Sequence, residues 1–284
     1  MKISVIITTY NWPEALALSL KSVLRQTTLP LEVIVADDGS GEETGEVIRN
    51  IASSAPIPII HSWQRDCGFR LARSRNRAIA RASGEYVILM DGDILAERHF
   101  VEDHHKFARS GFFVQGTRVL LTELLSKQVV GAGTLSANCC SPGVGNRKNC
   151  LRSNLLARLF SFRSTRIRGV KTCNFAFWRK DAIKVNGFNE EFVGWGREDS
   201  EFTVRLLNAG LRRQNVKFNA LAYHLYHPKS DRKHLPENDR ILQKTIDRGL
   251  TWCEHGLDQH LGKADVGTVR AGARAGKGVA ASRP

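Results

Sequence analysis

The stretch that decides the fold is Met90-Asp91-Gly92-Asp93, which directly follows the apolar run Tyr86-Val87-Ile88-Leu89. A strand that ends in this way presents two carboxylates at its carboxyl edge, where open α/β sheets bind ligands. Two hard oxygen donors at that edge suit a divalent cation that also holds a diphosphate. The same residues suit an ordinary Asp-Gly turn as well, so the interpretation depends on the rest of the chain.

Strand and helix patterns alternate upstream of this stretch, with short connections between them. Strands are expected at 3–9, 32–36, 58–61 and 86–90, and helices at 13–24, 42–54 and 71–82. Polar clusters follow three of the strands, at 8–11, 37–40 and 91–93. The alternation predicts an α/β fold with a mixed, mainly parallel sheet flanked by helices, and a site at its carboxyl edge. No Gly-x-Gly-x-x-Gly follows the first strand, which disfavours a dinucleotide-binding fold.

Downstream, the patterns predict a helix at about 97–109, a strand pair around 112–121 and a long loop at 133–150. The segment 151–163 interleaves apolar residues and arginines at helical spacing. Such a segment suits an anionic membrane surface, and equally a helix packed on its own domain with its arginines in water. From about residue 265 the chain is rich in Gly, Ala and Arg, which predicts a disordered basic tail.

The composition bounds the class of protein and its compartment. The chain has 284 residues, 42% of them hydrophobic and 25% charged, which is ordinary for a globular protein. It has no apolar run near the roughly 20 residues of a membrane span and no signal-peptide pattern, so a cytoplasmic location is expected. Its six cysteines form no Cys-x-x-Cys pair and are expected to stay reduced. Cys139-Cys140 with Cys150 could bind zinc, although ordinary packing is favoured.

The charge balance points to anionic partners. Lys and Arg total 42 against 28 Asp and Glu, which gives a net charge of +14. Nucleic acid, phosphorylated sugars and an anionic membrane face all fit such a charge, so the chemistry of the site must choose among them.

The second half of the chain carries a further set of polar motifs. Gly194-Trp195-Gly196-Arg197 allows a tight loop with an aromatic platform, and Glu198-Asp199 then open a helix. The helix dipole and capping explain acids at that position, but not the loop before them. His224 and His227 follow a strand-like run and could complete a metal site begun by Asp93, or could be ordinary surface histidines.

In their order along the chain, these motifs resemble a known family. Residues 5–11, 37–40, 75–76 and 91–93 are similar to an inverting glycosyltransferase of family 2, which has the GT-A fold. Residues 186–199 resemble the galactosyltransferase-type C-terminal half, found also in chondroitin-polymerase-like and polypeptide GalNAc-transferase-like enzymes. The resemblance implies a nucleotide-sugar-binding half at 1–110 and an acceptor and catalytic half of the same domain at 111–262, followed by the tail at 263–284.

The resemblance also implies a role for each motif residue. Asp199 would be the catalytic base, with Glu198 holding a sugar beside it, while Asp93 and either His224 or His227 would bind Mn²⁺ or Mg²⁺. The nucleotide would be bound by Thr8, Tyr10, Asp38, Asp66, Arg75 and Asp91, and the substrate sugars by Asn174, Trp195 and Gly196. Arg197 departs from the family, where a small residue is common, and so puts the donor sugar in doubt.

The implied chemistry agrees with the residue types. Inversion needs one carboxylate to take the proton of the attacking hydroxyl, and a metal to offset the charge on the departing UDP. Acid and metal must lie on opposite sides of the sugar, which Asp199 and Asp93 permit because they come from different halves of the chain.

The resulting hypothesis is transfer of a hexose or N-acetylhexosamine from a UDP-sugar to an anionic glycan or glycolipid acceptor. The setting would be cell-surface polysaccharide or lipopolysaccharide synthesis, with peripheral contact to an anionic membrane. A nucleic-acid-binding protein is disfavoured because many aromatic residues belong to apolar and loop motifs. A sugar nucleotidyltransferase is disfavoured because no Gly-rich basic loop follows the first strand. A binding module without activity stays open.

Overall fold

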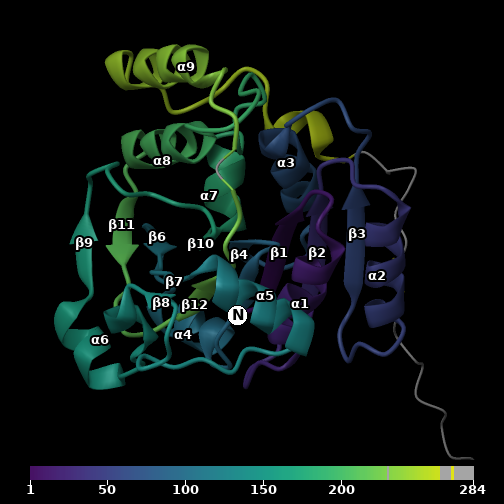
Figure 1. Ribbon diagram of the computed structural model, residues 1–284. Helices are drawn as coiled ribbons and strands as arrows, with labels where there is room; N and C mark the ends of the chain where they lie inside the picture. The colour runs from purple at the N-terminus through teal and green to yellow at the C-terminus, as the bar shows by residue number, and fades with distance from the viewer. Residues whose placement is uncertain (229, 263–269, 272–284) are drawn as a thin grey trace, which may run out of the picture.

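A nine-stranded mixed sheet forms the centre of the computed structural model, which describes residues 1–228, 230–262 and 270–271. Its strand order is β13-β3-β2-β1-β4-β10-β6-β11-β9, and Figure 1 shows β3 and β9 on opposite sides of the molecule. The strands of this sheet are β1 (Ile3–Thr9), β2 (Glu32–Asp37), β3 (Ile59–Trp63), β4 (Tyr86–Asp91), β6 (Phe112–Gln115), β9 (Phe162–Ser164), β10 (Asn174–Trp178), β11 (Arg212–Asn215) and β13 (Arg270–Ala271).

Helices cover both faces of the sheet because its central strands are apolar on both sides. Successive residues of β1 belong to two different cores, with Val5 and Ile7 on one face and Ile6 on the other. The first core is shared with α1 (Pro13–Leu24), α2 (Glu42–Ala52) and α4 (Phe100–Phe107). The second is shared with α3 (Leu71–Arg81), α7 (Arg179–Lys184) and α8 (Glu198–Asn208).

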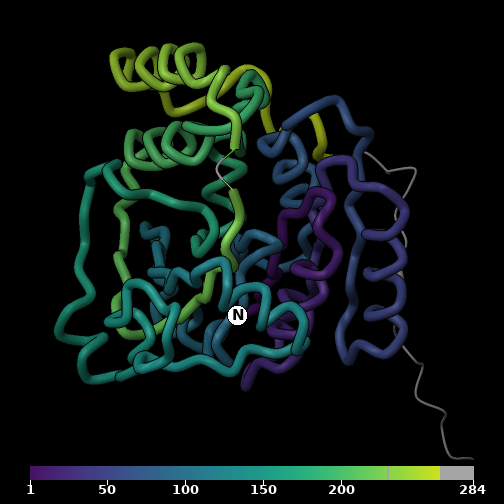
Figure 2. The backbone as a smooth tube through the Cα atoms, in the orientation of Figure 1, coloured from purple at the N-terminus to yellow at the C-terminus, as the bar shows by residue number. Residues whose placement is uncertain are grey.

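The remaining elements lie around these layers. Helix α9 (Leu235–Asp247) lies over α8, and α6 (Asn154–Phe160) lies near β9 (Figure 1). The other elements are α5 (Glu123–Ala132) and two short 3₁₀ helices at Arg147–Cys150 and Leu257–His260. The tube in Figure 2 shows most of the first hundred residues on one side of the molecule and most of residues 110–220 on the other, although α5 lies beside α1. Within the described residues, no helix combines the length and the apolar composition needed to cross a bilayer.

The parallel strands bring the polar strand ends together. β1 pairs in parallel with both β2 and β4, which places Thr8 opposite Asp91 and Thr9 opposite Asp37. β10 then runs antiparallel to β4 and to β6, while β11 is parallel to β6. Because β10 is antiparallel to both of its neighbours, β6 and β11 run in the same direction as β4 and end at the same edge. The carboxyl ends of β1, β2, β4, β6 and β11 therefore lie together at one edge, where a site can form.

A second, four-stranded sheet adds to this edge. It has the order β5-β12-β7-β8 and consists of β5 (Ile94–Ala96), β7 (Val119–Leu121), β8 (Val144–Gly145) and β12 (Ala222–His224). β12 pairs with β5 so that His224 lies opposite Ile94, the residue after Asp93. This pairing brings a residue of the second half next to the Asp-Gly-Asp stretch.

The predicted strands and helices of residues 3–91 are observed with shifts of one or two residues, but the later ones differ more. The strands at 112–121 form no pair: β6 joins the large sheet and β7 the small one. Gly116, between these two strands, permits the close approach of Asn174, because a Cβ there would meet the Asn174 side chain at 2.2 Å. The helix expected at 97–109 is the shorter α4, which begins after the Glu97 carboxylate accepts the backbone N–H of His99.

The segments at 133–164 also differ from their predictions. The expected loop at 133–150 contains β8 and a 3₁₀ helix. The segment 151–163 forms only the seven residues of α6, capped by Ser153, because Ser161 is extended and Phe162 begins β9. The predicted tail at 263–284 lies outside the described residues, apart from Arg270–Ala271, which pairs antiparallel with β3.

Candidate active site

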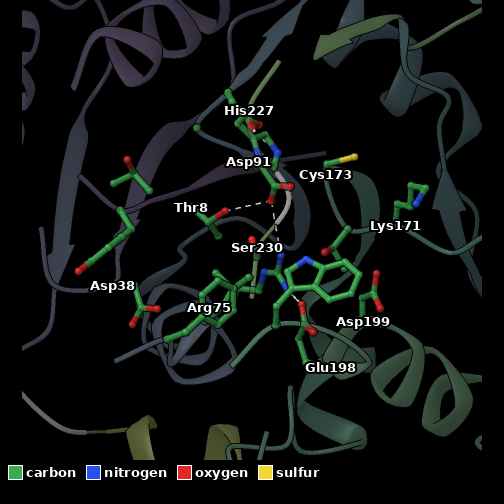
Figure 3. Close-up of a pocket in the computed structure, with 18 of the residues that line it drawn as sticks. Thr8, Asp38, Arg75, Asp91, Lys171, Cys173, Glu198, Asp199, His227 and Ser230 are labelled. Atoms are coloured by element: carbon green, nitrogen blue, oxygen red, sulfur yellow. Dashed lines mark hydrogen bonds and ion pairs between the residues drawn. The ribbon is translucent and has the colours of Figure 1, made fainter. Parts of the chain in front are cut away.

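A pocket of about 530 Å³ opens on the carboxyl edge of the large sheet, and Figure 3 shows the residues that line it. Both halves of the chain contribute to its wall. The lining residues with polar or aromatic side chains include Thr8, Tyr10, Asp38, Arg75, Asp91, Asp93, Arg118, Lys171, Cys173, Trp195, Glu198, Asp199, His224, His227, Ser230 and Arg232.

The N-terminal end of the pocket is built by the loops after β1 and β2. The buried Asp38 carboxylate accepts hydrogen bonds from the backbone N–H of Arg70, at 2.8 Å, and from Gln64 Nε2, at 2.6 Å. Burial raises the pKa of Asp38 to about 6. The Tyr10 hydroxyl donates to Asp66 at 3.0 Å, so Asp66 contacts the pocket through Tyr10.

Gly39 makes this close arrangement of loops possible. Its φ is +102°, and a Cβ at this position would lie 2.5 Å from the Cα of Asp66. Only glycine tolerates both the backbone angle and the approach of the neighbouring loop. The Asp-Asp-Gly-Ser motif therefore places Asp38 and Asp66 at one end of the pocket through its third residue.

Arg75 lies at the centre of the site and connects the two halves of the chain. It projects from α3, is only 2% exposed, and packs over the Phe188 ring at 5.1 Å. Its guanidinium lies 3.5 Å from an Asp91 oxygen and 3.2 Å from a Glu198 oxygen (Figure 3). Thr8 donates a further hydrogen bond to the same Asp91 oxygen, at 3.0 Å. The conformation of Asp91 is thus fixed from both sides.

Asp93, His224 and His227 form a group that could hold a metal ion, with one potential ligand atom from each residue lying within 4.8 Å of the others. The Nε2 atoms of His224 and His227 lie 3.7 Å and 3.4 Å from Asp93 Oδ2. His227 Nδ1 lies 2.7 Å from the carbonyl oxygen of Pro228, and by donating to it leaves Nε2 free as a ligand. Both histidines that the sequence left as alternatives therefore lie beside the aspartate.

The surroundings of this group fit a cation. Asp93 Oδ1 is buried and has no hydrogen-bond partner among the described residues. Burial and the nearby Asp91 raise the pKa of Asp93 to about 8, and a bound cation would offset that cost. Burial and Arg118 lower the pKa of His224 to about 4, which keeps its imidazole neutral for coordination. One carboxylate with two imidazoles favours Mn²⁺ over Mg²⁺, which prefers oxygen ligands alone.

The other end of the pocket carries the acids of α8, and Figure 3 shows Asp199 across the pocket from Asp38. Burial and Asp199 raise the pKa of Glu198 to about 7. Burial likewise raises the pKa of Asp199, while Arg75 and Lys171 oppose the shift. A carboxyl whose pKa is raised to about 7, as that of Glu198 is, can exchange protons near neutral pH, as general acid–base chemistry requires.

The start of α8 is fixed by contacts that the sequence did not reveal. Arg197 caps the helix in the left-handed conformation, with φ of 79°, and its side chain pairs with Asp239 of α9. Glu201 and Arg205 form a fully buried ion pair one turn later, and Thr245 of α9 donates to Glu201 at 3.1 Å. Arg197, the residue that differs from the small one expected from the resemblance, thus connects α8 to α9.

The predicted substrate residues fall into different surroundings. Trp195 lines the pocket and lies under the Arg232 guanidinium, which is 5.1 Å from the centre of its ring. Gly196 lines an adjoining groove that also contains Asp199. The buried Asn174 amide donates to the carbonyls of Thr117 and Ala220, and it lines a neighbouring pocket. Its role as a substrate contact stays a prediction.

Several lining residues escaped the sequence reasoning, among them Arg118, Lys171, Cys173, Ser230 and Arg232. Lys171 and Cys173 directly precede β10, an antiparallel strand that begins where its neighbours end. The polar residues before β10 could have been predicted to line the pocket, but only if the antiparallel direction of that strand had been known. Arg118 and Arg232 lie in loops and follow no sequence pattern.

The fold and the site define a class, the GT-A glycosyltransferase fold. The structure of S. aureus TarS residues 1–349 in complex with UDP has a TM-score of 0.60 and 18% identity, and covers 87% of this chain and 65% of that one. Its complex with UDP-GlcNAc also has a TM-score of 0.60, with 20% identity, and covers 87% of this chain and 66% of that one. The predicted fold is confirmed.

The comparisons of sequence confirm the predicted resemblance within that class. Residues 4–121 match the model described as glycosyl transferase family 2, and residues 157–228 match the one described as N-terminal domain of galactosyltransferase. Residues of both matched regions line the pocket, among them Asp91 in the first and Asp199 in the second.

Three relatives place the resemblance in context. Chondroitin synthase of Escherichia coli is 28% identical over 267 residues, covering 86% of this chain and 37% of the synthase. Hyaluronan synthase of Pasteurella multocida is 28% identical over 272 residues, covering 86% of this chain and 26% of the synthase. The putative glycosyltransferase EpsE of Bacillus subtilis is 26% identical over 257 residues and is covered over 86% of its length. The chain thus spans less than half of either synthase.

Proposed function

We propose that this chain is an inverting, metal-dependent glycosyltransferase that moves a hexose or an N-acetylhexosamine from a UDP-sugar to a glycan acceptor. The observation that carries the proposal is the arrangement along one pocket. Asp93 with two histidines lies at the sheet edge, Asp199 lies across from Asp38, and Arg75 bridges the acids between them. The relatives in chondroitin and hyaluronan synthesis support this function.

The donor would lie along the N-terminal end of the pocket. Tyr10, held by Asp66, would stack on or border the base, and the buried Asp38 would accept hydrogen bonds from the nucleoside. Asp91, fixed by Thr8 and Arg75, would bind the ribose. The UDP and UDP-GlcNAc complexes of the TarS structures support a nucleotide-sugar donor.

The cation and the acids would then divide the chemistry. Asp93, His224 and His227 would hold Mn²⁺, which supplies a positive charge to the diphosphate of the leaving group. Asp199 would accept the proton of the acceptor hydroxyl as that oxygen attacks the anomeric carbon. Glu198, ion-paired with Arg75, would orient the donor sugar, and Trp195 would stack on the sugar face.

The acceptor is proposed to be an anionic glycan or glycolipid of cell-surface polysaccharide synthesis. The net charge of +14 supports an anionic acceptor. The chain would act in the cytoplasm, which its six free cysteines support.

A peripheral membrane contact would bring the enzyme to a lipid-linked acceptor. Leu155 and Leu159 of α6 are 68% and 66% exposed, and Phe160 and Phe162 beside them are exposed as well. Arg158 lies among these residues and would face anionic headgroups. Leu159→Asp should reduce sedimentation with phosphatidylglycerol vesicles, whereas Leu124→Asp, at the equally exposed Leu124 of α5, should leave it unchanged.

The decisive experiment measures UDP release with Mn²⁺ across a panel of UDP-sugars, in the wild type, Asp199→Asn and Asp93→Ala. Sugar-selective release that needs Mn²⁺ and is lost in both variants would support the proposal and identify the donor. Absence of release with every sugar, together with absence of UDP binding by calorimetry, would overturn it. Salt-sensitive binding of single-stranded nucleic acid in that case would favour the alternative suggested by the charge.

A further inference from the structure

A second pocket, of about 250 Å³, lies beside the active site on the same sheet edge. It lies at the ends of β6 and β11, where Gln115 and Asn215 are register partners, and at the start of β10 at Asn174. We call it the side pocket. Its other lining residues include Thr117, Arg118, Asn146, Asn149, Lys171, Cys173 and Lys217.

The side pocket is continuous with the active site through shared walls. Arg118, Lys171 and Cys173 line both cavities. Lys171 also lines the groove that contains Asp199, and its charge opposes the rise in the pKa of that carboxyl. A chain of sugars whose hydroxyl reaches Asp199 could therefore extend past Lys171 into the side pocket.

The charge of the side pocket is of one sign. Its lining residues include three cations, Arg118, Lys171 and Lys217, and no aspartate or glutamate. Neither Lys171 nor Lys217 forms an ion pair with any residue in the described part of the chain. Burial, with the charges of Lys148 and Arg213 nearby, also lowers the pKa of Lys217. Cations gathered without acids favour an anionic ligand.

The rest of the lining suits a sugar. Side-chain amides of Asn146, Asn149 and Asn215 border the cavity, and amides present both donors and acceptors to hydroxyl groups. The cavity is the size of about eight water molecules at roughly 30 Å³ each, which admits one charged sugar unit but no larger polymer cross-section.

We propose that the side pocket binds the anionic group, a carboxylate or a phosphate, of the acceptor sugar unit that precedes the glycosylated one. This rests on the proposed function, because it assigns part of the acceptor site of the same reaction. Lys217 and Lys171 contact the anion, and the asparagine amides contact the ring hydroxyls. The side pocket therefore contributes to acceptor specificity, whereas the donor binds in the larger active-site pocket.

The test compares Lys217→Gln with the wild type on three acceptors of equal length. These are an oligosaccharide containing glucuronate, the same oligosaccharide with its carboxyls reduced to alcohols, and a phosphorylated oligosaccharide. Lys244→Gln, on the exposed surface of α9, is the matched control. Acceptor KM, donor KM and acceptor binding by calorimetry are measured for each protein.

The proposal expects Lys217→Gln to raise the KM and Kd of an anionic acceptor about 10- to 100-fold, with donor KM unchanged. The KM and Kd of the oligosaccharide with reduced carboxyls should change in neither variant. Of the glucuronate-containing and the phosphorylated oligosaccharides, the one with the larger change in Lys217→Gln identifies the anion as carboxylate or phosphate. Equal effects on charged and neutral acceptors, or none on either, overturn the side-pocket proposal. Tight, Lys217-dependent acceptor binding without any UDP release would instead overturn the proposed transferase activity and keep the pocket.

Discussion

The two ends of the active-site pocket are built in different ways. At the N-terminal end, Asp38 directly follows β2 and Asp91 is the last residue of β4, and both strands are buried and parallel. At the C-terminal end, Asp199 opens a helix, Lys171 precedes an antiparallel strand, and His224 ends a strand of the second sheet. The first end follows from local sequence order, whereas the second exists only because separate elements pack together.

Arg75 is where the two ends meet. Its guanidinium contacts Asp91 of the first end and Glu198 of the second, and it is nearly inaccessible to water. A buried cation between two acids holds their positions and lowers their mutual repulsion. If the two ends divide donor binding and proton transfer, substitutions at each end should affect different steps.

The largest expected effect comes from Asp199→Asn at the C-terminal end. Asparagine keeps the shape of the side chain but cannot take the acceptor proton, so transfer should fall about 10²- to 10⁴-fold. UDP affinity by calorimetry should stay within about twofold, since the proposed nucleotide site lies at the other end. Asp247→Asn, at the exposed C-terminal end of α9, is the control and should keep full activity. A parallel loss of UDP affinity would show that the two ends are not separate.

Arg75→Met should break the connection itself. The substitution leaves Asp91 and Glu198 without their shared cation, so the free energy of unfolding should fall by about 3–5 kcal/mol. Urea denaturation measures this loss of stability. The affinity for the donor and the rate of transfer should both decrease. Arg73→Met, on the exposed face of the same helix, should cost less than about 0.5 kcal/mol. Equal stability of the two variants would contradict the bridging role.

Gly39→Ala should weaken the N-terminal end alone. A Cβ would meet the Asp66 backbone at 2.5 Å and would sit at a φ of +102°, which together cost about 1–3 kcal/mol. Gly68→Ala is the matched control, because its φ is +77° but nothing lies within 4 Å of the added Cβ. UDP affinity should fall more in Gly39→Ala than in Gly68→Ala. Similar affinities would mean that the Asp38–Asp66 arrangement does not bind the nucleotide.

The smallest expected effect is a pH dependence of the C-terminal end. Burial raises the pKa values of Glu198 and Asp199, so Asp199, the proposed base, holds its proton to higher pH than an exposed carboxyl does. The transfer rate should therefore fall as the pH drops through the raised pKa of Asp199, by up to tenfold per pH unit. Glu198→Gln removes the neighbouring negative charge and should move this limb to lower pH. An unchanged midpoint in Glu198→Gln would contradict coupling of the two carboxyls.

The difference between the ends also explains what the sequence could predict. The strands ending at Thr9, Asp37 and Asp91 were expected within one residue, because buried parallel strands leave continuous apolar runs. The split of β6 from β7 was missed, because which sheet a three-residue strand joins depends on its partners rather than on its own pattern. Arg118 and Arg232 were missed for a similar reason, since loop residues reach a pocket through the path of the whole chain.

The sequence by itself determined the alternation of strands and helices, the polar clusters at the strand ends and the order of the family motifs. Only the tertiary structure decided that Arg75 joins Asp91 to Glu198, although Glu198 lies 123 residues away along the chain. It likewise decided that both His224 and His227 lie beside Asp93. Periodicity records which face of an element is buried, whereas contacts between distant elements depend on register and packing that no local pattern encodes.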